Sequence, residues 1–184
     1  MVDYKTFKKG YLTEWVDRSQ AARKAAEELA KKELGPSLRD KYRIIMTLNG
    51  KQVEFKSENE EKRDGDIYFT YDEAMERFGK PDEYGWRLPT KEELETLKND
   101  YSYEFDKVSG QGVFDNHLAL PATGFCYCGG DVANVGFSGR YWSSTPNPKI
   151  PDNAWYLYFY SGGVVVYFTF RSHSQSVRLV RDVK

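Results

Sequence analysis

From residue 101 to its end, the sequence shows no helical periodicity, and this constrains the fold more than any other feature. Aromatic and β-branched runs alternate with glycines, and they are densest in AWYLYFYSGGVVVYFTF, residues 154–170. Short runs of this kind, bounded by turn residues, are typical of antiparallel strands. The carboxy-terminal half is therefore predicted to form an irregular, turn-rich antiparallel sheet.

Alternation along residues 155–160 divides their side chains between two faces, because successive residues of a strand point to opposite sides. If Trp155, Leu157 and Phe159 face the core, the three tyrosines between them face the other way. Exposed aromatic area of this size usually marks a recognition surface. The alternative is that these rings bury one another in a second core.

Two helices are expected before the sheet. Apolar spacing predicts a short helix over residues 70–79, and a second is predicted after Thr90, where Glu93 completes a capping box. Asn49-Gly50, between two apolar runs, predicts a β-hairpin. The expected fold class is α+β, with helices flanking the irregular antiparallel sheet.

A further amphipathic helix is predicted over residues 12–34, ending before Gly35. Its narrow, alanine-rich apolar stripe either packs on its own domain or pairs with copies of itself in a homo-oligomer. We expect residues 1–40 to be a helical extension and residues 41–184 to be one domain, as the length of 184 residues allows.

Charge and hydropathy exclude several partner classes. The 27 basic and 28 acidic residues nearly cancel, which argues against a nucleic-acid partner. No apolar run reaches the length of a membrane span, so membrane insertion is not expected, and the first residues lack the apolar stretch of a secretory signal. The compartment is left open; virion association and cell-surface display both fit.

Cysteine and histidine are too sparse for an obvious catalytic or metal site. Cys126 and Cys128 are expected to be free thiols, because two residues so close strain a disulfide and no nearby His or Cys completes a zinc set. His117 and His173 lie outside any recognisable nucleophile motif. We therefore expect no cofactor, no metal and no enzymatic activity.

Five motifs carry a resemblance to a known family. GWRLPTKEEL, LALPATGF, GRYWSST, AWYLYFYSGGV and SVRLVR follow one another at spacings similar to those of the Fibrobacter major paralogous domain family. The resemblance covers about residues 41–184 and implies a C-type-lectin-like fold. The variable proteins of diversity-generating retroelements have the same fold. The resemblance therefore implies a non-enzymatic protein that binds a protein or glycan on a cell or particle surface, with a phage receptor-binding protein as one such case.

The resemblance separates frame positions from variable ones. Trp86, Trp142 and Trp155 are expected to fill the core, and Ser174 departs from the glycine often found in the family at that place. The frame positions it implies are Ala154, Trp155, Leu157, Phe159, Val164, Val166, Arg171, Ser176, Val177 and Arg178. The variable, ligand-binding positions it implies are Tyr156, Tyr158, Tyr160, Val165, Tyr167, Phe168, Thr169, Phe170, Ser172, His173 and Gln175.

Two other functions remain open. A calcium-dependent carbohydrate-binding lectin would need oxygen ligands, and Asn147, Asp152 and Asn153 lie in one proline-containing loop. The usual lectin triplets are missing, however. The fold is also similar to that of formylglycine-generating enzymes, whose cysteines do the chemistry, so Cys126 and Cys128 keep a thiol enzyme as a less favoured alternative.

Overall fold

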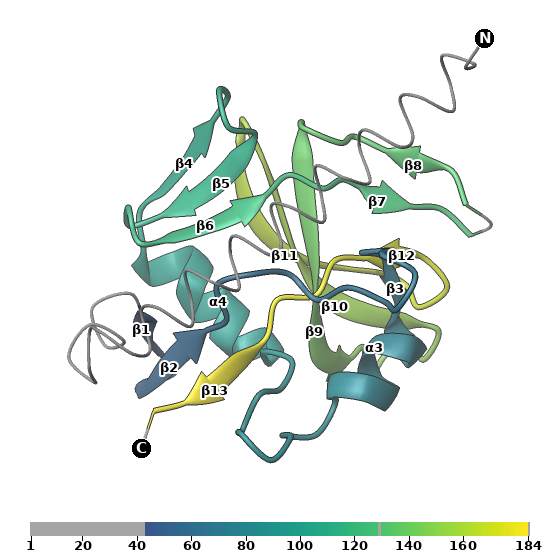
Figure 1. Cartoon of the computed structure of the whole chain (residues 1–184), viewed down its shortest axis with the longest axis horizontal. Coiled ribbons are helices and arrows are strands. Elements are labelled where there is room, and N and C mark those ends of the chain that lie inside the picture. The colour runs from purple at the N-terminus through teal and green to yellow at the C-terminus, as the bar shows by residue number, and fades with distance from the viewer. Residues whose placement is uncertain (1–42, 129, 184) are drawn as a thin grey trace, which may run out of the picture. The chain divides into compact units, whose positions relative to one another are not determined.

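Strands dominate the computed structural model, which describes residues 43–128 and 130–183 (Figure 1). The predicted helix over 12–34 and the extension over 1–40 lie outside these residues. The strands are β1 (Ile44–Leu48), β2 (Lys51–Phe55), β3 (Phe69–Thr70), β4 (Tyr103–Asp106), β5 (Gln111–Phe114), β6 (Leu118–Pro121), β7 (Phe125–Cys126), β8 (Val132–Ala133), β9 (Ser138–Pro146), β10 (Asn153–Tyr160), β11 (Gly163–Phe170), β12 (Ser174–Gln175) and β13 (Val180–Asp182). The helices are α3 (Tyr71–Phe78) and α4 (Lys91–Asp100).

The strands form four small sheets in which all the paired strands are antiparallel. Their strand orders are β1-β2-β13, β11-β10-β9, β3-β12-β7-β8 and β4-β5-β6. The last strand, β13, pairs with β2 in the sheet that also contains the first strand, β1. The first and last strands of the domain therefore lie in one sheet (Figure 1). The described residues are therefore mainly β with two short helices.

Local chemistry explains both helices, and their predicted starts are confirmed. Thr70 caps α3 and Thr90 caps α4, each accepting a hydrogen bond from the backbone N–H of the glutamate three residues later. Each glutamate carboxylate in turn accepts from the N–H of its threonine, which completes two capping boxes. Gly79 follows the last residue of α3 as expected, in a right-handed conformation.

The hairpin predicted at Asn49-Gly50 is also confirmed. Asn49 has a φ of 49° and Gly50 a φ of 73°, and these two residues connect β1 to β2 in an uninterrupted antiparallel register. Two positive φ values match the tight turn whose twist suits the flanking strands, and Asn-Gly adopts them at low cost. The turn therefore fixes which residues of β1 and β2 face the core.

Strand β10 lies between two apolar cores. Leu157 and Phe159 are fully buried in the first core, whereas Ala154 and Tyr156 are buried in the second. The first core includes Met46, Leu48, Val53, Phe55, Leu94, Leu97, Phe114, Leu118, Leu120, Tyr141 and Val180. The second includes Phe69, Tyr71, Ala74, Leu88, Trp142, Val177 and Leu179.

The tryptophans expected in the core divide. Trp142 is fully buried and donates its indole N–H to the carbonyl of Phe69 at 2.8 Å. Trp86 and Trp155 are only partly buried. The Lys91 ammonium lies 4.3 Å from the centroid of the Trp155 ring, so Trp155 connects β10 to α4 instead of filling a core.

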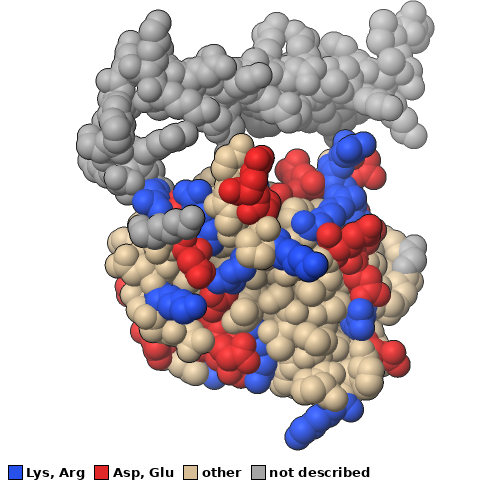
Figure 2. All heavy atoms as spheres, turned by 90° about the horizontal axis from the view of Figure 1, so that it is seen from below, with Lys and Arg blue, Asp and Glu red and all other residues tan. Residues whose placement is uncertain are grey.

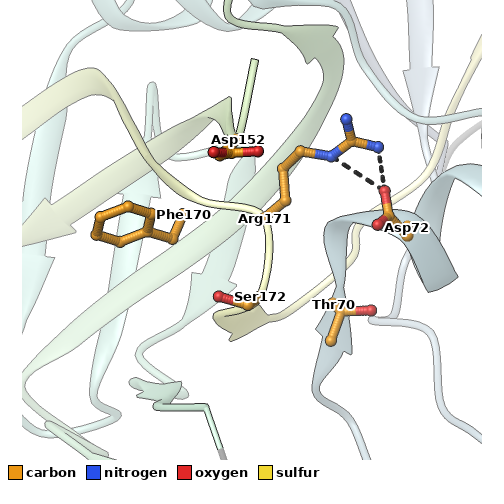
Figure 3. Close-up of a pocket in the computed structure, with 6 residues that line it drawn as sticks. All are labelled: Thr70, Asp72, Asp152, Phe170, Arg171 and Ser172. Atoms are coloured by element: carbon orange, nitrogen blue, oxygen red, sulfur yellow. Dashed lines mark hydrogen bonds and ion pairs between the residues drawn. The ribbon is translucent and has the colours of Figure 1, made fainter. Parts of the chain in front are cut away.

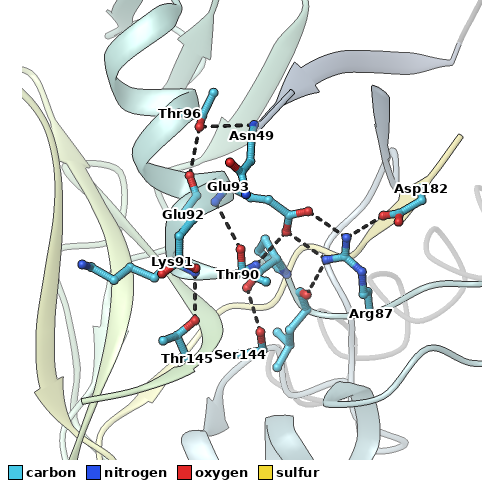
Figure 4. A network of polar contacts seen from close by, with 12 residues as sticks. Asn49, Arg87, Thr90, Lys91, Glu92, Glu93, Thr96, Ser144, Thr145 and Asp182 are labelled. Carbon is cyan, nitrogen blue, oxygen red and sulfur yellow. Dashed lines mark hydrogen bonds and ion pairs between the residues drawn. The ribbon is translucent and has the colours of Figure 1, made fainter. Parts of the chain in front are cut away.

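A charged network fixes the start of α4 (Figure 4). Arg87 donates to both carboxylate oxygens of Glu93, at 2.8 and 2.7 Å, and to Asp182 at 2.6 Å. Glu93 is 5% exposed, and the bidentate contact with Arg87 balances its buried carboxylate. The hydrogen bonds to Glu93 and Asp182 raise the pKa of Arg87 and tie α4 to β13.

Two further arginines also pair locally. Arg178 donates to Asn59 Oδ1 at 2.9 Å and to the carbonyls of Lys56 and Ser57 at 3.0 Å each. Arg181 binds Glu54 at 2.8 Å. Arg178 therefore holds the chain after β2, and Arg181 holds β2 itself, against the carboxy-terminal segment.

Among the described residues, no helix is long and apolar enough to cross a membrane.

We predict that Glu93→Ala lowers the free energy of unfolding by about 2–4 kcal/mol, because it leaves Arg87 without its main partner and removes half of a capping box. Urea denaturation of the full chain measures this. Glu95→Ala is the matched control, since Glu95 forms an exposed ion pair with Lys91 and should cost less than about 0.5 kcal/mol. Equal losses in both variants would contradict the structural role of the network.

We also predict a loss of stability at alkaline pH that Tyr141 accounts for in part. Burial raises the pKa of Tyr141 from 10.0 to about 12, so the unfolded chain releases this proton first as the pH rises. The free energy of unfolding should therefore hold below about pH 10 and fall between about pH 10 and 12. Urea titrations across this pH range measure the effect. In Tyr141→Phe the free energy of unfolding should fall less with pH than in the unmodified protein. In Tyr84→Phe, which changes an exposed ring, it should fall as much as in the unmodified protein.

Candidate functional site

On one face of the β10–β11 hairpin, β10 is buried at Tyr156 and exposed at the end next to the turn, which we call the open end, whereas β11 is exposed at both Val165 and Tyr167. In its register, Tyr156 lies opposite Tyr167 and Tyr158 opposite Val165. Tyr156 is only 5% exposed, since it packs against Trp142 in the second core. The expectation that Tyr156 is exposed is therefore wrong, and the second-core alternative holds for this residue.

Exposed apolar and aromatic side chains at the open end, along β11 and in the loop after β7 form a group that we call the aromatic face. Tyr158 and Tyr160 stack with ring centroids 5.4 Å apart. Tyr127, in the loop after β7, belongs to the same group through ring contacts with Phe125 and His173. The exposed fractions are 51% for Tyr127, 42% for Tyr160, 41% for Val165, 54% for Tyr167 and 57% for Phe170.

Arg140 lies at the border of this face. It is paired with Tyr158 across β9 and β10, and its guanidinium carbon lies 3.4 Å from the Phe125 ring centroid. It is also 5.2 Å from the centroid of Tyr158 and 5.6 Å from that of Tyr156. A guanidinium in this position is attracted by the ring faces, so Arg140 links the aromatic face to the second core.

His173 forms the other border. Its Nδ1 lies 2.9 Å from the hydroxyl of Thr169, and its ring contacts those of Tyr127 and Phe170. Partial burial and the positive charge of Arg140 lower the pKa of His173, because both disfavour the imidazolium. The neutral ring is therefore favoured at this edge, where it can donate or accept one hydrogen bond.

Three other predicted ligand-binding positions lie elsewhere. Gln175 is fully buried, so it cannot contact a ligand at the surface, and both of its amide atoms lack a partner among the described residues. Phe168 points to the opposite face of the hairpin and packs against Trp155. Ser172 is exposed and accepts a hydrogen bond from Cys128 at 3.0 Å.

A polar pocket adjoins the aromatic face at Phe170 (Figure 3). It encloses about 580 Å³ and is lined also by Thr70, Asp72, Asp152, Arg171 and Ser172. Arg171 pairs with Asp72, and its guanidinium lies 4.9 Å above the Tyr71 ring. The arginine charge is therefore compensated within the protein, as expected of a frame residue.

The proposed calcium and thiol chemistries receive little geometric support. The side-chain oxygen of Asn147 accepts hydrogen bonds from the N–H groups of Lys149 and Ile150, which occupies it inside its own loop. Within residues 43–128 and 130–183, no three His, Cys, Asp or Glu side chains gather in a way that could hold a metal. Cys126 and Cys128 are free thiols.

Arg140, Phe125 and Tyr127 were missed by the sequence reasoning. Arg140 lies two residues before the buried Trp142, so strand alternation in GRYWSST places both on one face. Alternation in this motif could therefore have indicated Arg140. Phe125 and Tyr127 reach the face through the pairing of β7 with β12, which no local pattern indicates.

We predict that Tyr156 and its cross-strand partner Tyr167 respond differently to truncation. Tyr156→Ala should lower the free energy of unfolding by about 3 kcal/mol or more, because it opens a cavity beside Trp142. Tyr167→Ala should change it by less than about 0.5 kcal/mol, because that ring is exposed. Chemical denaturation of both variants measures this, and similar losses would contradict the assignment of Tyr156 to the second core and of Tyr167 to the surface.

Comparison with known proteins gives one match. The sequence model of the Lcl C-terminal domain family matches residues 49–181. No curated protein matches, and no solved structure matches. The family is linked to the Fibrobacter paralogous domains, which confirms that part of the resemblance, and it suggests a lectin-like module that binds a ligand. The chain belongs to the Lcl C-terminal domain family.

Proposed function

We propose that this chain is a non-enzymatic ligand-binding protein that presents the aromatic face on a rigid, C-type-lectin-like frame to a receptor on a cell or particle surface. The observation that carries this proposal is the set of exposed side chains on the β10–β11 hairpin, Tyr160, Val165, Tyr167 and Phe170, together with the exposed Tyr127 in the loop after β7. A soluble surface rarely gathers so many aromatic rings without a partner.

The side chains suit recognition. Tyrosine offers a large, rigid contact area and a polar end, and it loses little entropy on binding. Tyr158, Tyr160 and Tyr167 lie on two paired strands, so their backbone positions are fixed before a partner arrives. Preorganisation of this kind lowers the ordering cost of binding.

The frame beneath the face supports the same reading. Leu157 and Phe159, which alternate with the tyrosines, are fully buried, and Val164 and Val166 on the next strand pack against the same core. The alternation of fixed and exposed positions is the pattern that the resemblance to retroelement variable proteins implies. Diversification of Tyr158, Tyr160, Val165, Tyr167 and Phe170 remains part of the proposal.

Charge supports a partner chosen by shape and local contacts. On the surface seen in Figure 2, Lys and Arg side chains alternate with Asp and Glu, and one area consists of uncharged residues. A mixed surface of this kind gives no large single-sign field to attract a polyanion.

The test is binding of the purified full chain to a panel of bacterial surface glycans and envelope proteins, with and without a calcium chelator. We predict that Tyr160→Ala/Tyr167→Ala weakens the strongest interaction about tenfold or more, because truncated aromatic hot spots commonly cost over 1 kcal/mol each. Tyr84→Ala removes a more exposed ring that is distant in the sequence, and this variant should bind normally.

The possible results separate the candidate functions. Binding that persists in chelator and is lost in the double variant supports the aromatic face. Binding that the chelator abolishes would favour a calcium lectin. Binding that is unchanged in the double variant, with its fold verified by circular dichroism, would reject this face as the site.

A further inference from the structure

The side chain of Arg140 is charged and has no polar partner among the residues that the structure describes. No side-chain hydrogen bond or ion pair joins it to any other described residue, and its Nε is buried with nothing to accept the N–H. Buried N–H groups are nearly always paired, and a guanidinium left unpaired away from water is costly. The other structural arginines, Arg87, Arg178 and Arg181, all bind oxygen atoms of the protein.

The surroundings of Arg140 fix its orientation. The guanidinium carbon lies 3.4 Å from the centroid of Phe125 and 5.2 Å from that of Tyr158, so the group is held against ring faces. Arg140 is half-buried, and its two terminal nitrogens, unlike Nε, are not buried atoms left without a partner. Ring contacts use the faces of a guanidinium, and its N–H donors lie in its plane. These donors are therefore available at the aromatic face.

We propose that Arg140 is the docking point for a carboxylate of a protein partner, an Asp or Glu side chain that enters the aromatic face. This inference rests on the ligand-binding function proposed above. A carboxylate matches the fork of guanidinium donors and would bind it through two parallel hydrogen bonds. It would also balance a positive charge that no described carboxylate balances.

The shape of the surface favours a protein over a small ligand. Small ligands are usually held in concave pockets, and the pocket beside Phe170 is lined by Arg171 and Asp72 and does not include Arg140. Tyr160, Val165 and Tyr167 are instead 41–54% exposed on paired strands. Protein interfaces place arginine and tyrosine together at their central hot spots, surrounded by apolar contacts that exclude water.

The experiment selects a displayed library of random linear peptides on the immobilised full chain and measures the affinity of recovered peptides by calorimetry. Each peptide is also made with its Asp and Glu replaced by Asn and Gln. The protein variants are Arg140→Gln, Arg140→Lys and, as a matched control, Arg63→Gln, which removes one positive charge from an exposed loop residue. Thermal unfolding verifies that each variant is folded.

We predict that recovered peptides are enriched in Asp or Glu beside apolar residues. Neutralising that acid should weaken binding to the unmodified protein roughly tenfold or more, and should change binding to Arg140→Gln little, since the two changes remove the same contact. Arg63→Gln should behave like the unmodified protein. Arg140→Lys should recover only part of the affinity, because an ammonium lacks the planar fork. The comparison of acidic and neutral peptides on the unmodified protein needs no variant to fold.

Several outcomes would overturn the inference. The first is recovery of peptides that are not enriched in Asp or Glu, and the second is recovery of no peptide that binds saturably. The third is that neutralising the acid weakens binding to the unmodified protein and to Arg140→Gln equally. Saturable binding of sialyllactose or a glucuronic-acid oligosaccharide that Arg140→Gln abolishes would assign the site to an acidic sugar instead. Peptides that depend on Tyr160 and Tyr167 but not on Arg140 would reject this inference and keep the proposed function. Peptides that depend on none of the three residues would reject both.

Discussion

The burial of β10 on both of its faces is the constraint on which the rest of the structure depends. Leu157 and Phe159 fill one core, and Ala154 and Tyr156 fill the other. A central strand of this kind must be paired on both edges, which β9 and β11 provide. The small peripheral sheets and the two short helices then close each core, so many short elements pack into one domain without long regular structure.

Local chemistry made part of the fold predictable. The Asn49-Gly50 turn and the capping boxes at Thr90 and Thr70 follow from residues a few positions apart, and such signals act before any tertiary contact forms. The pairing of β13 with β2 was not predictable in this way, because residues more than a hundred positions apart carry no local mark of their contact.

The candidate site was predictable only to the level of the strand. Alternation correctly separated Leu157 from its neighbouring tyrosines, but it says which face a side chain takes and nothing about what covers that face. Trp142 packs against Tyr156, whereas Tyr160 is exposed. Arg140 reaches the same face only through the register of β9 with β10, and only the folded chain shows that its side chain has no polar partner among the described residues.

The unbroken register of β10 with β11, from Asn153↔Phe170 to Tyr160↔Gly163, limits how this protein can change in length. Side chains alternate with a period of two, so one residue inserted within either strand would exchange core and surface positions from that point onward. Substitutions at the open end carry no such penalty. The hairpin can therefore tolerate a change of side chain far better than a change of length, and additions should be confined to its exposed turn at Ser161 and Gly162.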